Sequence, residues 1–197
     1  MPPVSPALPE RVPPLRRVLH LLRGEYGALN LRWLVASGIA RLLPRMAFVR
    51  TRTALYRLGG VRIGRGTSFY GPATIWAGLC RFPERLTIGT NCRINSPLYA
   101  ELDAPISIGD SVAIGWDVRL ITSNHALGGA ENRAGPNLAS PVSIGDGCWI
   151  GAGATLLPGV TIGRGSIVAA GSVVAGSCGP GTLLAGNPAR PIRKLGA

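Results

Sequence analysis

The sequence predicts an all-β solenoid, a chain wound into stacked coils, preceded by a short helical segment. The first observation is a six-residue repeat from Ile144 to Cys178, with an aliphatic residue in the first position of each unit and a small residue such as Ala154 or Ser166 in the fifth. The second is that 28 of the 197 residues are glycine. A period of six fits neither a helix nor a single amphipathic strand, whereas stacked coils of short strands and tight corners produce it.

A recurring dipeptide supports the coil. Ile-Gly occurs seven times, starting at Ile63, Ile88, Ile108, Ile114, Ile144, Ile150 and Ile162. A glycine allows a tight corner where a Cβ atom or a positive φ would be costly. We therefore expect each isoleucine to point inward, onto its counterpart in the next coil.

The repeat divides the chain into segments. Residues 1–14 contain six prolines and are expected to form a disordered or extended tail, and residues 15–58 form an Arg-rich helical segment. The solenoid is expected over residues 59–190, with residues 191–197 as a C-terminal tail. The six-residue period stops at His125 and resumes near Val142, so residues 126–140 should leave the coil as a loop.

The cysteines indicate neither a disulfide framework nor a zinc site. Three of the four, Cys92, Cys148 and Cys178, occupy the small fifth position of a hexapeptide, and no C-x-x-C spacing exists. We expect buried, reduced thiols and hence a cytoplasmic protein.

Positive charge is concentrated near the N-terminus. The formal net charge is +12, and residues 1–60 hold ten arginines against Glu10 and Glu25. Two apolar patterns there have helical spacing: Leu15, Val18, Leu19 and Leu22, and then Leu31, Leu34, Val35, Gly38, Ile39 and Leu42. The longest uncharged stretch within the two helical patterns, residues 33–40, is far too short to span a bilayer, and no signal-peptide cleavage pattern follows.

Three interpretations of this segment stay open. Its helices could cap the first coil, covering an apolar end that a solenoid cannot leave exposed. They could instead lie on an anionic membrane, which would place the protein on the inner membrane face. Nucleic-acid binding agrees with the basic composition, but the segment contains no recognition motif or interleaved aromatic residues.

The repeats and several longer motifs identify a resemblance. The motifs are Trp149-Ile150-Gly151, residues 158–163 (PGVTIG), Ala170-Gly171-Ser172 and residues 186–190 (GNPAR). From Ile88 to Arg193 the chain resembles the hexapeptide-repeat acyltransferases, in particular the galactoside and maltose O-acetyltransferase branch. The resemblance implies a left-handed parallel β-helix and a homotrimer with active sites between neighbouring subunits.

The resemblance also implies a reaction. Acetyl-CoA would be the donor, and a hydroxyl of a saccharide or lipid-linked saccharide would be the acceptor. His125, the residue before the expected loop, matches the catalytic base of that branch, and histidine can accept a proton near neutral pH. Asn95 and Asp103 match residues that contact the acceptor. By itself, the spacing is also compatible with a structural role for His125 and with Asn95 and Asp103 as ordinary polar corner residues.

The cofactor-binding residues are likewise implied by the resemblance. Trp149 would stack along the pantetheine arm, the backbones at Ala170 and Ala175 would line it, and the Ala152 N–H would stabilise the oxyanion. Two guanidinium groups, at Arg190 and Arg193, would reach the nucleotide phosphates. Residues 176–180 (GSCGP) lack the lysine that relatives often have there, which removes one cofactor contact.

Other functions are disfavoured or remain alternatives. A γ-class carbonic anhydrase needs three histidine ligands and the chain has two histidines, so no metal is expected. Residues 1–60 differ from the N-terminal domain of the sugar acetyltransferase branch and are more similar to the start of acetyltransferases from exopolysaccharide gene clusters. N-acetylation of an amino sugar is the alternative reaction, and a non-catalytic, membrane-associated β-helical scaffold is the alternative without chemistry.

Overall fold

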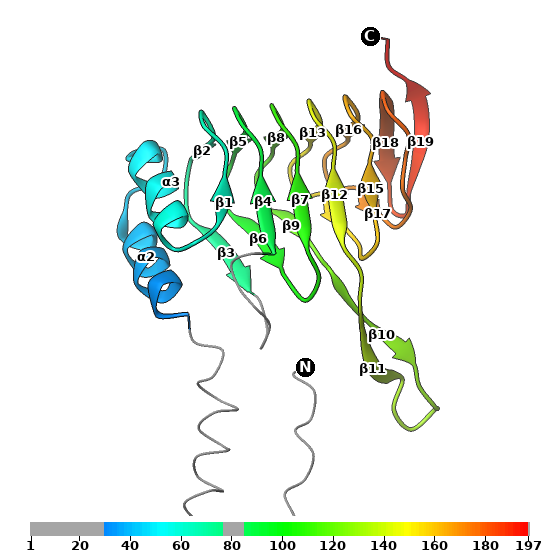
Figure 1. Cartoon of the computed structure of the whole chain (residues 1–197). Helices are drawn as coiled ribbons and strands as arrows, with labels where there is room; N and C mark the ends of the chain where they lie inside the picture. The colour runs from blue at the N-terminus through cyan, green and yellow to red at the C-terminus, as the bar shows by residue number, and fades with distance from the viewer. Residues whose placement is uncertain (1–29, 77–84, 197) are drawn as a thin grey trace, which may run out of the picture.

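The computed structural model describes residues 30–76 and 85–196. Here the chain forms three parallel sheets that it visits in turn, with two helices at one end of the stack and a hairpin that leaves its side (Figure 1). The Pro-rich tail, the pattern from Leu15 to Leu22, His20 and Cys80 lie outside the described residues.

The first and third sheets each contain five parallel strands. In spatial order, the first sheet consists of β1 (Arg62–Ile63), β4 (Leu86–Ile88), β7 (Ile106–Ile108), β12 (Val142–Ile144) and β15 (Thr161–Ile162). The third sheet consists of β3 (Ala73–Trp76), β6 (Leu98–Glu101), β9 (Val118–Leu120), β14 (Thr155–Leu156) and β17 (Val173–Val174).

The second sheet is the longest and carries the C-terminal end of the described chain. Its order is β2 (Ser68–Phe69), β5 (Arg93–Ile94), β8 (Ala113–Ile114), β13 (Trp149–Ile150), β16 (Ile167–Val168), β18 (Thr182–Gly186) and β19 (Ala189–Lys194). The last pair is antiparallel and the other pairs are parallel. Since β19 pairs with β18 from Ala189 to Lys194, it crosses the boundary expected at residue 190, and most of the predicted tail is strand.

The register follows the six-residue repeat. Ile144 is aligned with Ile108 on one side and with Ile162, three hexapeptides later, on the other. All three are at most 3% exposed, and the buried core consists largely of such inward-pointing aliphatic residues. A six-residue unit therefore forms one side of the coil, as predicted.

The glycine of the Ile-Gly pair is needed because neighbouring coils approach closely. A Cβ atom on Gly115 would lie 2.5 Å from the backbone nitrogen of Ala152 in the next coil. Positive φ is instead found at a later corner position, as at Gly153, where φ is +71°. The corners thus use glycine for two physical reasons at two positions.

Helices α2 (Leu31–Leu42) and α3 (Val49–Leu58) lie beside the first coil. Helix α3 packs against β1 and β2. Tyr56 contacts Phe69 edge to face, and its hydroxyl oxygen accepts a 2.8 Å hydrogen bond from the Ala73 backbone N–H. Helix α2 packs on α3 through Trp33 and the buried Ala36 and Ala40.

The capping interpretation therefore describes α3, which covers the first coil. The face of α2 that the sequence singled out does not cover it: Leu34 is 55% exposed and Leu42 is 84% exposed, whereas Ala36, Ser37 and Ala40 are buried. Small residues let the two helices pack closely, so the large aliphatic residues of α2 face outward. In the described ranges, no helix is long and apolar enough to cross a membrane.

Arg52 fastens the two helices to the coil. It is fully buried, and its guanidinium group donates hydrogen bonds to five backbone carbonyl groups, those of Ala40, Leu43, Pro44, Ala47 and Phe69. Burial lowers the pKa of Arg52. The five carbonyl groups compensate for the lost hydration of the cation without a carboxylate partner.

The three cysteines in the described ranges are free thiols, as expected. Cys92 and Cys148 are buried and Cys178 is partly buried. Burial raises the pKa of the Cys92 and Cys148 thiols. These thiols therefore behave as compact packing groups.

Candidate active site

A β-hairpin carries His125 out of the coil. Strands β10 (Ser123–Leu127) and β11 (Ala134–Ala139) pair antiparallel between β9 and β12, and they project from the stack (Figure 1). The sequence predicted an excursion over residues 126–140 but described it as a loop, which is wrong. Nearly all of its side chains are exposed or half-buried, so the alternation of apolar and polar residues that reveals a strand is missing.

The hydrogen bond of the His125 ring defines its chemistry. Nδ1 lies 2.7 Å from the carbonyl oxygen of Gly135 on the facing strand. A carbonyl oxygen can only accept, so Nδ1 carries the proton in the neutral ring and Nε2 is left as the acceptor. The His125 side chain is exposed, which makes this nitrogen accessible to a substrate.

Asp103 is connected to the same hairpin. It follows β6, at the corner where the chain passes from the third sheet to the first sheet of the next coil. Its Oδ2 accepts a hydrogen bond of 2.9 Å from Nδ2 of Asn137, and Asn137 is the register partner of His125. The structure thus connects the predicted base with one predicted acceptor-binding residue.

Sequence reasoning missed Asn137, which makes this connection. Its other amide atom, Oδ1, is buried and has no hydrogen-bond partner among the described residues. An isolated asparagine in a segment expected to be a loop gives no recognisable signal. Its role depends on strand pairing, which the sequence did not indicate.

Glu101 was also missed. Its carboxylate accepts hydrogen bonds from the backbone N–H groups of Thr122 and Ser123 at 3.2 and 3.1 Å, and from the Ser123 hydroxyl at 2.7 Å. These contacts hold the start of β10 against the preceding coil. Glu101 therefore fixes the base of the hairpin that carries His125.

Asn95 lies at a different corner. It follows β5, where the chain passes from the second to the third sheet, and its backbone N–H bonds to Ile114 of the next coil. Ala152 follows β13 and Ala170 follows β16, so both lie at the same corner in later coils. One chain therefore does not bring Asn95, Ala152 or Ala170 together with His125.

The remaining predicted cofactor-binding residues lie mainly on the second sheet. Trp149 begins β13 and is 57% exposed on the outer face, while its neighbour Ile150 points into the core. Arg190 and Arg193 lie on β19, at the end of the same sheet. Ala175 follows β17, at the corner shared with Asp103 and the hairpin.

These groups are available to a ligand. Within residues 30–76 and 85–196, the only ion pair joins Arg119 and Asp117, so neither Arg190 nor Arg193 is neutralised by a carboxylate there. The Ala152 N–H makes no hydrogen bond with another described residue. An exposed ring, two unpaired cations and a free N–H fit an elongated ligand that carries phosphates and a carbonyl group.

Nothing in the described part of the chain resembles a metal site, since no three His, Cys, Asp or Glu side chains cluster there. The candidate site therefore consists of His125, the polar pair Asp103 and Asn137, and the exposed Trp149, Arg190 and Arg193 of the second sheet.

Comparisons with known proteins agree with this architecture. Residues 141–176 match the family model "Bacterial transferase hexapeptide (six repeats)". Nodulation protein L of Rhizobium leguminosarum bv. viciae is 39% identical over 142 residues, covering 69% of this chain and 68% of that protein. A hexapeptide-repeat containing acetyltransferase from Vibrio cholerae, solved with acetyl coenzyme A, is 31% identical, with a TM-score of 0.72 over 88% of this chain and 90% of that one.

The chain belongs to the hexapeptide-repeat acetyltransferase family. A galactoside acetyltransferase solved with coenzyme A has a TM-score of 0.75 and 26% identity, covering 94% of this chain and 92% of its own. The galactoside O-acetyltransferase of Escherichia coli is 34% identical over 119 residues. Matches to three other curated relatives span 62%, 58% and 61% of their own lengths, about three fifths.

Membership of the hexapeptide-repeat acetyltransferases explains the period of six and the regular corners. It does not account for the outward apolar face of α2, which lies outside the matched repeats.

Proposed function

We propose that this protein transfers the acetyl group of acetyl-CoA to a hydroxyl of a saccharide, with His125 as the general base. The main observation behind this proposal is the hydrogen bond between His125 Nδ1 and the Gly135 carbonyl oxygen. It orients the ring and leaves Nε2 as the proton acceptor on an exposed hairpin. Family membership and the relatives named for galactoside acetylation support the choice of a saccharide.

The proton transfers follow from this geometry. Nε2 of His125 accepts the proton of the acceptor hydroxyl while the hydroxyl oxygen forms a bond to the acetyl carbonyl carbon. The carbon–sulfur bond then breaks, and the imidazolium returns the proton to the leaving thiolate. The Gly135 carbonyl stabilises the imidazolium because it keeps accepting from Nδ1 throughout.

Donor binding is proposed along the second sheet and its corner with the third, with Ala175 contributed from the corner that follows the third sheet. Acetyl-CoA supplies an activated acyl group as a thioester. Trp149 would cover the pantetheine arm, while the backbones at Ala170 and Ala175 line it. Arg190 and Arg193 would bind the phosphates, and the free Ala152 N–H would donate to the developing oxyanion.

We propose that Asp103 and Asn137 bind the acceptor beside His125. The Asp103 carboxylate can accept further hydrogen bonds from hydroxyl groups, while Asn137 orients it through Nδ2. A carboxylate beside the proposed base suits a saccharide, which presents several hydroxyl donors.

The complete site is proposed to form between two chains of a homotrimer wound as left-handed β-helices. Asn95, Ala152 and Ala170 lie at one corner of the coil, and Asp103 and the hairpin lie at another. A second copy that brings its corner to the hairpin would unite the two sets. The free thiols fit a reducing cytoplasm.

The test is an acceptor screen with the purified full-length chain and acetyl-CoA, following release of free thiol. Galactosides, maltose, amino sugars and lipid-linked saccharides should be compared, with His125→Ala as the matched blank. We expect acceptor-dependent thiol release that disappears in the variant. Equal release by both proteins, or release with no product acetylated on oxygen, would contradict the proposal.

A further inference from the structure

One face of α2 has the composition of a membrane-binding helix. The apolar stripe, defined as Leu31, Leu34, Val35, Gly38, Ile39 and Leu42, follows the i, i+3, i+4 spacing of one helical face. Each of its five large side chains is at least 46% exposed. The residues that pack toward the rest of the protein, including Ala36 and Ala40, lie on the other side of the helix.

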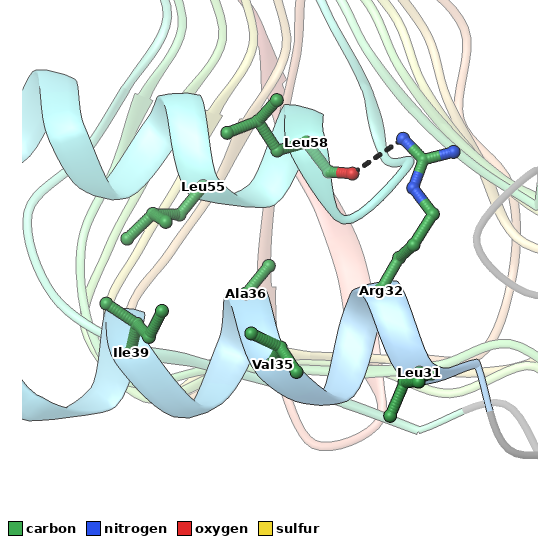
Figure 2. Close-up of a pocket in the computed structure, with 7 residues that line it drawn as sticks. All are labelled: Leu31, Arg32, Val35, Ala36, Ile39, Leu55 and Leu58. Atoms are coloured by element: carbon green, nitrogen blue, oxygen red, sulfur yellow. Dashed lines mark hydrogen bonds between the residues drawn. The ribbon is translucent and has the colours of Figure 1, made fainter.

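The stripe continues into a groove between the two helices. Leu31, Val35 and Ile39 of α2 line an open space of about 440 Å³ together with Leu55 and Leu58 of α3 (Figure 2). At one end of the groove, the Arg32 guanidinium group donates a 2.8 Å hydrogen bond to the Leu58 carbonyl oxygen. The apolar surface therefore has a cationic group at its edge.

Charge around the stripe has one sign. At 100° per residue, Arg32 and Arg41 project on opposite sides of the stripe. Residues 30–76 contain eight arginines and no Asp or Glu. Seven of the eight are exposed, since only Arg52 is buried. No carboxylate of this region can neutralise them.

We propose that the apolar stripe and its flanking arginines dock the protein on an anionic phospholipid surface. Aliphatic side chains on one helical face enter the boundary between headgroups and acyl chains, and arginines beside them pair with anionic headgroups. Both features of α2 are satisfied by the same surface. The inference is independent of the acetyl-transfer proposal, because binding to vesicles requires neither donor nor acceptor.

Charge disfavours the other occupants. A second copy of the chain would bring its own Arg32 and Arg41 to the contact, and residues 30–76 offer no carboxylate to pair with them. The chain's own residues 15–22 carry Arg16 and Arg17 and no acidic residue, so they would also add positive charge. An anionic phospholipid surface both offsets this charge and accepts a long apolar stripe.

The test uses the full-length chain and sedimentation with vesicles of phosphatidylcholine, alone or with about one quarter phosphatidylglycerol. We expect binding to the anionic vesicles only, and release at about 0.5 M salt, where charges are screened within a few ångströms. Arg41→Gln should weaken binding about fivefold. Leu34→Glu combined with Ile39→Glu should weaken it about tenfold or more, whereas Leu127→Glu on the hairpin should not.

Gly38 provides a test by gain of binding. It lies within the stripe, and a Cβ atom there would have nothing within 4 Å. Gly38→Leu should strengthen binding to anionic vesicles about fivefold or more by extending the apolar surface. Gly38→Gln improves helix propensity similarly without adding that surface, and it should not strengthen binding.

Several outcomes would overturn the proposal. One is a wild-type chain that ignores anionic vesicles at low salt. Another is binding that survives the Leu34→Glu, Ile39→Glu change, which would indicate attraction of charge alone, as to nucleic acid. A third is a double variant with a changed oligomeric mass or a lowered unfolding temperature, which would show that protein covers the stripe.

Discussion

At the residue scale, the proposed chemistry depends on how the His125 ring is held. Its Nδ1 is committed to the Gly135 carbonyl, so Nε2 is the available base. The contact is made to a backbone atom, and side-chain substitutions on the facing strand therefore leave the acceptor itself in place. The function of the histidine rests on hairpin geometry more than on its immediate sequence.

The first prediction concerns this base. His125→Ala should lower kcat by about 10²–10⁴-fold, the usual contribution of general acid–base catalysis. Affinity for acetyl-CoA, measured by calorimetry, should stay unchanged because none of the proposed contacts that hold the coenzyme A part of the donor comes from His125. Leu127→Ala is the control, since this exposed residue is on the same hairpin. A variant with wild-type kcat would remove His125 from the mechanism.

The second prediction concerns Arg190, whose guanidinium group has no carboxylate partner among the described residues. Arg190→Ala should weaken binding of acetyl-CoA about tenfold or more, since a charge-assisted hydrogen bond contributes about 1.5–3 kcal/mol. The dephospho-CoA thioester should lose less affinity if the arginine binds the removed phosphate. Arg133→Ala on the hairpin is the matched control, and equal losses for both thioesters would exclude this role.

At the element scale, the hairpin acts as a positioning device. Glu101 holds its base to the preceding coil, and Asn137 connects its second strand to Asp103. Because β11 pairs with β10 in a fixed register, His125 and Asn137 face the same region from opposite strands. The hairpin thus brings the proposed base and the proposed acceptor-binding groups together within one chain.

The third prediction tests this connection. Asn137→Leu removes the hydrogen bond to Asp103 and the free carbonyl oxygen while retaining a similar volume. The KM for the acceptor should rise about tenfold or more, whereas the KM for acetyl-CoA should not change. Leu138→Asn, at the neighbouring exposed position, is the control. Equal changes in both KM values would indicate a distorted hairpin instead.

The fourth prediction concerns the helical cap. Arg52→Met keeps an unbranched apolar stem but leaves up to five carbonyl groups without their donor. An orphaned buried acceptor costs about 1–3 kcal/mol, so the free energy of unfolding should fall by about 3 kcal/mol or more. Chemical denaturation would measure it. Arg50→Met, an exposed arginine on the same helix, should have little effect.

At the scale of the whole molecule, the two corners of the coil carry different parts of the proposed site. Asn95 and Ala152 share one corner, while Asp103 and the hairpin share another. A rigid coil cannot bring its own corners together. An assembly in which one copy's corner meets its neighbour's hairpin satisfies this geometry.

The fifth prediction tests that assembly by complementation. His125→Ala and Asn95→Ala should each be nearly inactive alone. Coexpressed in equal amounts, they should recover about one quarter of wild-type activity, because random mixing leaves that share of intersubunit sites intact. His125→Ala with Asp103→Ala is the control, and it should not recover activity, since one chain supplies both residues. Failure of the first pair to complement would contradict a site that two chains share.

The sequence by itself determined the coil and its repeating unit. It also predicted that the chain leaves the coil after His125, whereas the hairpin begins slightly earlier, at Ser123. A six-residue period predicts which side chains point inward, because every side of the coil has the same arrangement of inward and outward residues. It also located the corners that carry Asn95 and Asp103. These features follow from local spacing, so no long-range contact was needed to predict them.

Only the tertiary structure decided that residues 123–139 form a hairpin and that the apolar stripe of α2 points outward. Residues 123–139 contain no alternation that separates a hairpin from a loop, and pairing across the turn depends on backbone groups that sequence patterns do not record. The apolar stripe of α2 was correctly recognised as one helical face, but periodicity cannot say which way a face points. The small residues Ala36, Ser37 and Ala40 pack toward α3 because they allow close approach, and this leaves the large aliphatic residues facing outward.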